Sequence, residues 1–69
     1  MTAREARRAI ERDGWYHVGG SGSHQQFKHP SKPGRVTIPV HGGATIKVDT
    51  LKRIIQQAGL TADEFAALL

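Results

Sequence analysis

The sequence predicts a single α+β domain in which one helix, three antiparallel strands and a second helix follow one another, with a short third helix at the end. Two observations carry this prediction. Apolar residues recur at intervals of three and four near both ends of the chain, as on one face of a helix, and they alternate with polar residues in its middle, as in half-buried strands. A chain of 69 residues has room for one hydrophobic core, so residues 1–69 are expected to form one domain.

The first helix is predicted over residues 3–12. Thr2 and Glu5 have the spacing of a capping box, in which the hydroxyl accepts from a helix amide and the carboxylate reaches back to the cap. Gly14 then ends the helix. The apolar face of this helix consists of Ala3, Ala6, Ala9 and Ile10.

Three short strands are predicted in the middle of the chain, over residues 15–18, 24–29 and 35–40. Glycines at residues 19–22 end the first strand and form a loop that leads directly into His24. The second and third strands are separated by a segment rich in proline and glycine, which is typical of a turn.

The alternation within the strands predicts which side chains share a face. If Phe27 and Ile38 point into the core, the alternate residues lie on a face open to solvent. Because Pro39 has no amide to donate, the third strand is expected at the edge of the sheet. The open face would present His24, Gln26, Lys28, Arg35 and Thr37.

A second helix follows the third strand and ends at Gly59. Thr61 and Glu64 repeat the capping-box spacing, while Leu60 and Phe65 occupy the positions of a hydrophobic staple, so a short third helix is expected at the end. The apolar stripe of the second helix consists of Val48, Leu51, Ile54, Ile55 and Ala58.

The charge is unevenly distributed along the chain. The formal net charge is +4, and no acidic residue lies between Gly14 and Val48, a segment that contains all four histidines. An acid-free basic segment favours a polyanionic partner such as nucleic acid, although it also fits an ordinary solvated surface. The chain has no cysteine and no apolar run of membrane-spanning length, so a cytoplasmic location without disulfides or thiolate metal sites is expected.

Imidazole is the one reactive group that the middle of the chain offers in several copies. The glycine loop lacks the lysine of a phosphate-binding loop, the histidine spacings match no familiar zinc pattern, and no carboxylate is at hand for a two-acid or two-metal centre. His24 is the candidate general acid or base, since cations would surround it on the open face. A surface histidine without a role remains the alternative for His24. Packing suits His17 and His29 better, and turn formation explains His41 equally well.

Three motifs together resemble the HicA family of bacterial and archaeal toxins. They are Gly22-Ser23-His24, the run Ile-Pro-Val-His-Gly-Gly over residues 38–43, and Gln-Ala-Gly-Leu over residues 57–60. They stand in the family's order, and the likeness extends over nearly the whole chain. The resemblance implies a fold like that of the double-stranded RNA-binding domain.

The resemblance also implies the toxin of a type II toxin–antitoxin system, a metal-independent endoribonuclease that cleaves messenger RNA. The family's catalytic histidine falls on His24, and we expect Gly22 and Ser23 to shape the loop while Lys28 and Arg35 hold phosphate. A HicB-type antitoxin is the expected protein partner. No cofactor, no membrane and no DNA binding by the toxin alone are expected.

Two other functions fit the same charge distribution. One is a module that binds double-stranded RNA without cutting it, for which replacement of His24 would leave RNA affinity unchanged. The other is a basic adaptor for an acidic protein, which would bind no RNA even at low salt, where phosphate contacts are strongest.

Overall fold

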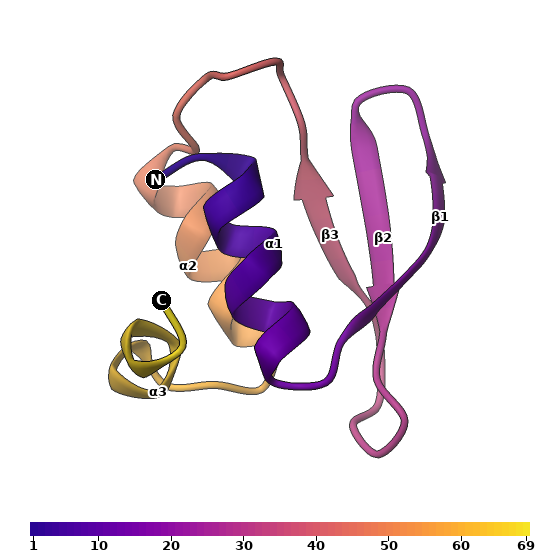
Figure 1. The fold of residues 1–69 in the computed structure, drawn as a ribbon, viewed down its shortest axis with the longest axis vertical. Coiled ribbons are helices and arrows are strands. Elements are labelled where there is room, and N and C mark those ends of the chain that lie inside the picture. The colour runs from indigo at the N-terminus through magenta and orange to yellow at the C-terminus, as the bar shows by residue number, and fades with distance from the viewer.

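The computed structural model describes all 69 residues and has one three-stranded sheet with helices packed on one side of it (Figure 1). The predicted α+β order of one helix, three antiparallel strands and two helices is confirmed. In chain order the elements are α1 (Ala3–Arg12), β1 (Tyr16–Ser21), β2 (His24–Lys28), β3 (Val36–Pro39), α2 (Val48–Gln57) and α3 (Ala62–Ala67).

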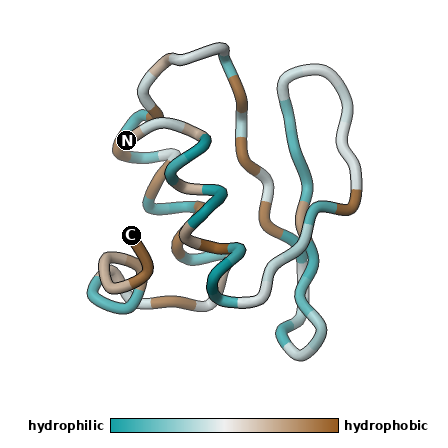
Figure 2. The backbone as a smooth tube through the Cα atoms, in the orientation of Figure 1, coloured by the Kyte–Doolittle hydropathy of each residue, from teal (hydrophilic) through white to brown (hydrophobic).

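The sheet has the order β1-β2-β3, and both neighbouring pairs are antiparallel. β3 is therefore an edge strand, as Pro39 predicted, and it is the strand nearest the helices in Figure 1. Brown apolar segments alternate with paler ones along β3 in Figure 2, which is the pattern of a strand with one buried face.

The core lies between that face of the sheet and the helices. Phe27 and Ile38 are fully buried there, as predicted, and Trp15 is only 2% exposed. No polar or charged side chain is buried with them. The helices contribute Ala3, Ala6, Ala9, Ile10, Ile54 and Phe65 to this core, and Ala58 joins them from the C-cap of α2.

Both predicted capping boxes are present. The amide of Glu5 donates to the Thr2 hydroxyl at 3.2 Å, and the Thr2 amide donates back to the Glu5 carboxylate at 2.9 Å. These bonds to the Thr2 backbone and side chain lower the pKa of Glu5, because they stabilise its charged form. Thr61 and Glu64 form the same pair at the start of α3, which lowers the pKa of Glu64 for the same reason.

The first strand is longer than the alternation of residues 15–18 predicted. β1 continues through Gly19 and Gly20, which pair with Gln26 and Gln25 of β2, so the glycines are part of the sheet and not a loop. The φ angle is +147° at Gly19 and +130° at Gly20. Only glycine adopts this backbone conformation without strain.

The connection between β1 and β2 is a two-residue turn. Ser21 pairs directly with His24, which leaves only Gly22 and Ser23 between the strands. Gly22 has φ of +58° and Ser23 has a negative φ, the signs expected of a type II′ hairpin turn with glycine at its first central position. His24 thus begins a strand whose register is set by a tight turn.

The apolar stripe predicted for α2 is correct except at its first residue. Ile54 and Ala58 are buried, and Leu51 and Ile55 pack against the core. Val48, the first residue of α2, is 66% exposed. None of the three helices is long and apolar enough to cross a bilayer.

His29 ties the turn after β2 to the end of α1. Its Nε2 lies 2.7 Å from the carbonyl oxygen of Asp13, and its Nδ1 accepts from the amides of Ser31 at 3.0 Å and Lys32 at 3.1 Å. The ring also stands edge-on to Trp15, with centroids 5.2 Å apart. The packing role predicted for this histidine is therefore confirmed, and its ring nitrogens are both in use.

Replacement of His29 by alanine is expected to lower the free energy of unfolding by about 2–4 kcal/mol, because three hydrogen bonds of about 1 kcal/mol each and an aromatic contact are lost. Urea denaturation measures the change. His17→Ala is the matched control, since this exposed imidazole packs on Phe27 and donates to nothing, and it should cost less than about 1 kcal/mol. Equal losses in the two variants would contradict this role of His29.

Candidate active site

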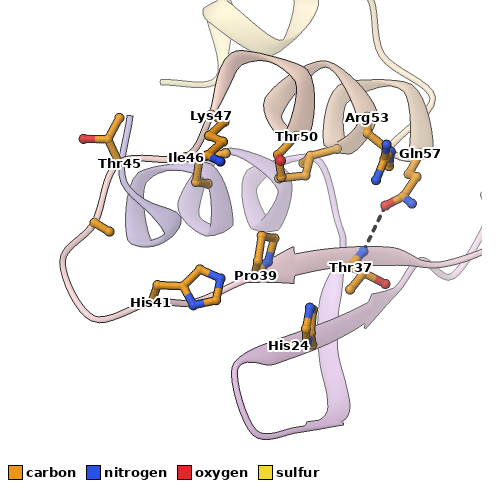
Figure 3. Close-up of a pocket in the computed structure, with 12 residues that line it drawn as sticks. His24, Thr37, Pro39, His41, Thr45, Ile46, Lys47, Thr50, Arg53 and Gln57 are labelled. Atoms are coloured by element: carbon orange, nitrogen blue, oxygen red, sulfur yellow. Dashed lines mark hydrogen bonds between the residues drawn. The ribbon is translucent and has the colours of Figure 1, made fainter.

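A groove of about 620 Å³ runs between the free edge of β3 and α2, within the size range of small-molecule and nucleotide sites. His24 lines it from β2, and His41 lines it from the segment that follows β3 (Figure 3). The wall opposite the sheet belongs to α2. The residues that line it are His24, Thr37, Pro39, His41, Ala44, Thr45, Ile46, Lys47, Thr50, Arg53, Ile54 and Gln57.

The sheet register places His24 in the groove. His24 pairs with Pro39, and both alternate with the buried Ile38, so their side chains lie on the open face as predicted. The His24 ring is exposed and makes no hydrogen bond within the protein. An exposed imidazole without a partner is free to exchange a proton with a bound molecule.

The helical wall carries a polar stripe. Lys47 is the N-cap residue of α2, and Thr50, Arg53 and Gln57 follow at intervals of three, three and four residues, so they line one side of the helix. Figure 3 shows this stripe across from Thr37 and Pro39 of β3. The N-terminus of α2, whose amides carry partial positive charge, lies at the same end as Lys47.

Gln57 holds the two walls together. Its Oε1 accepts a hydrogen bond from the Thr37 amide at 3.0 Å, the dashed line in Figure 3. The Thr37 amide points away from β2, at the free edge of the sheet. The next residue of β3 whose backbone nitrogen points that way is Pro39, which has no amide hydrogen to donate. The edge is thereby closed to further strand pairing, and the groove above it is left to another kind of ligand.

The groove favours negative charge. Its lining contains no aspartate or glutamate, whereas Lys47 and Arg53 both contribute cations. Neither of these side chains forms an ion pair or a hydrogen bond within the protein; the ion pairs of the chain are Arg7 with Glu11 and Lys32 with Asp13. Two unpaired cations on one wall would attract a phosphate.

The predicted phosphate ligands Lys28 and Arg35 lie on the open face but not in this groove. Lys28 is four residues along β2 from His24, a distance of about 13 Å at roughly 3.3 Å per residue. Both cations border a smaller depression at the other end of the sheet, and Arg35 Nη1 donates to Gln26 Oε1 at 2.9 Å. The structure therefore brings His24 together with α2 and separates it from this pair.

Nowhere in the chain do three side chains of His, Cys, Asp or Glu gather as potential metal ligands. The chemistry that the groove itself offers is therefore that of two imidazoles, two cations and several hydroxyl and amide groups. Such a set can transfer protons and bind an anion at the same time.

A protein-family model described as "HicA toxin of bacterial toxin-antitoxin" matches residues 3–60, which include every element that lines the groove. The chain belongs to the HicA toxin family. No curated protein matches it in sequence. HicA membership makes the chain a toxin-family protein and implies an antitoxin as its partner.

The site residues predicted from the sequence all lie on or beside the sheet, and none belongs to α2. Lys47, Arg53 and Gln57 were absent from the predicted site, and His41 was assigned equally to turn formation. The available signal was the polar stripe beside the apolar one on the second helix, because a helix with two such faces can pack on a core and border a site at once.

Proposed function

We propose that the chain is a metal-independent endoribonuclease toxin that cleaves messenger RNA, with His24 as a general acid or base. The observation that carries the proposal is the groove at the β3 edge, where a free imidazole faces two unpaired cations and no carboxylate, in a HicA-family chain. RNA contains its own nucleophile, the 2′-hydroxyl, so cleavage requires proton transfer and phosphate binding alone.

The other predicted site residues have roles along the bound strand. Gly22 and Ser23 form the turn that presents His24, and their backbone can approach RNA closely because the turn is exposed or nearly so. Lys28 and Arg35, at the far end of the open face, would hold a phosphate some nucleotides away from the scissile bond. The sheet would thus bind the strand along its length.

A HicB-type antitoxin is the proposed protein partner in the cytoplasm. An antitoxin that silences this toxin must keep RNA out of the groove, and an acidic surface placed against Lys47 and Arg53 would do so by charge. Residues that cover His24 would serve the same purpose by exclusion.

Incubation of the purified chain with RNA in excess EDTA tests the proposal. We expect cleavage at the same rate with and without EDTA, products that end in a 2′,3′-cyclic phosphate, and no cleavage of DNA of the same sequence, which lacks the 2′-hydroxyl. Activity that disappears in EDTA would contradict the metal-independent mechanism. RNA that is bound but stays intact would show a double-stranded RNA-binding module instead.

A further inference from the structure

The groove contains a second titratable group that the proposed reaction can use. Cleavage by the 2′-hydroxyl moves two protons, one from the nucleophile and one to the leaving oxygen, and His24 provides a single imidazole. Among the residues that line the groove, His41 is the one besides His24 that carries an imidazole, a group that can act as a general acid or base. The sequence alone explained His41 equally well by its position beside two glycines.

The β2–β3 ladder brings His41 near His24. The pairing of His24 with Pro39 continues one step further, since the amide of Val40 donates to the carbonyl of Ser23. His41 follows Pro39 by two residues, just beyond the paired part of β3, and lines the same groove as His24.

Both rings are free to take part in chemistry. His41 is exposed, its ring makes no hydrogen bond within the protein, and Figure 3 shows it at the end of the groove beyond Pro39. The remaining histidines are not available in this way: His29 uses both ring nitrogens in structural bonds, and His17 packs on Phe27 at the opposite face of the sheet.

The same wall supplies a site for the scissile phosphate. Lys47 at the N-cap of α2 and Arg53 within it border the groove and have no protein partner, whereas Arg35 is bonded to Gln26 at the distant end of the sheet. A phosphate held between α2 and β3 would lie beside both imidazoles. A guanidinium suits this position because it can donate two parallel hydrogen bonds to one phosphate.

We propose that His41 and His24 divide the two proton transfers and that Lys47 and Arg53 bind the scissile phosphate, an assignment that rests on the proposed ribonuclease function. One neutral imidazole takes the proton of the 2′-hydroxyl as the 2′-oxygen attacks phosphorus. The bond from phosphorus to the 5′-oxygen breaks, and the other imidazole, which is protonated at the start, donates its proton to that oxygen. The products are a 2′,3′-cyclic phosphate and a 5′-hydroxyl.

A short RNA with one bond that the wild type cuts, and the same RNA with sulfur in place of the bridging 5′-oxygen, test the division of labour. A thiolate leaves without a proton, so the sulfur substrate no longer needs the acid. We expect His24→Ala and His41→Ala each to cut the oxygen substrate at least 100-fold more slowly than wild type. Only one of them, the variant that lacks the acid, should return to within about 10-fold of the wild-type rate on the sulfur substrate.

Two control variants accompany the test. His17→Ala removes an exposed imidazole outside the groove, and Lys52→Ala removes an exposed cation of α2 that does not line it. Both should keep wild-type rates. Arg53→Ala should lower kcat/KM by at least about 10-fold, with circular dichroism verifying that each variant is folded.

The outcomes separate the two proposals. If the wild type cuts no RNA, the ribonuclease function itself fails. If the wild type cuts RNA and His41→Ala cuts the oxygen substrate at the wild-type rate, or the sulfur substrate restores neither histidine variant, the role of His41 is overturned while the proposed function stands. Equal kcat/KM for Arg53→Ala and Lys52→Ala would overturn the phosphate site.

Discussion

Replacement of His24 by alanine is expected to slow RNA cleavage by about 10²–10⁴-fold, the usual contribution of one general acid or base. The fold should be retained, because the His24 ring is exposed and forms no hydrogen bond within the protein. Single-turnover cleavage of a labelled RNA measures the loss, and added imidazole should restore part of the rate by entering the space that the side chain leaves.

RNA affinity distinguishes a catalytic role from a binding role. The dissociation constant of His24→Ala should stay within a few-fold of the wild type, since the groove retains Lys47 and Arg53 as its cations. In cells, the same variant should abolish growth arrest and leave messenger RNA intact. A variant that loses affinity and cleavage to the same extent would show that His24 binds RNA without moving a proton.

The helices of this fold were predictable from local chemistry. The start of α1 follows from Thr2 and Glu5, because a capping box needs only two residues three positions apart. Val48 has the spacing of the apolar stripe, and yet its side chain is 66% exposed. Periodicity assigns a residue to a face but does not say where the neighbouring layer ends.

The sheet half of the candidate site was predictable, and the helical half was not. Alternation from Phe27 places His24 on the open face in any register that buries this aromatic ring. That α2 stands beside β3 and adds Lys47 and Arg53 to the groove follows from tertiary packing, which includes the bond from the Thr37 amide to Gln57. No local pattern specifies a contact between residues 20 positions apart in sequence.

The glycines before His24 were predicted as a loop because glycine is generally depleted in strands. At Gly20, glycine is required inside the strand because a side chain has no space there. A Cβ atom on Gly20 would lie 2.1 Å from the carbonyl oxygen of His24, closer than any real contact, and the Gly20 φ of +130° excludes other residues as well. This close approach links the glycine run to the position of the histidine.

Gly20→Ala is therefore expected to lower the free energy of unfolding by about 2–6 kcal/mol. Backbone strain accounts for about 1–3 kcal/mol of this loss and the steric overlap for about 1–3 kcal/mol. A chain of 69 residues has a total stability of about 3–10 kcal/mol, so much of the variant should be unfolded at 37 °C. Thermal unfolding followed by circular dichroism measures the loss. Cleavage should fall further than the folded fraction does, because the backbone that must move carries His24.

Gly19→Ala is the matched control for this prediction. Gly19 also has a positive φ, +147°, but a Cβ atom there would meet nothing within 4 Å, so its replacement carries the strain without the overlap. We expect Gly19→Ala to lower the free energy of unfolding less than Gly20→Ala does, by the about 1–3 kcal/mol of the steric overlap. Its cleavage rate should fall only in proportion to its folded fraction. Equal costs at the two positions would mean that backbone conformation by itself requires the glycines. A larger loss at Gly20 would instead show that β1 must approach β2 this closely to hold the strand that carries His24 in register.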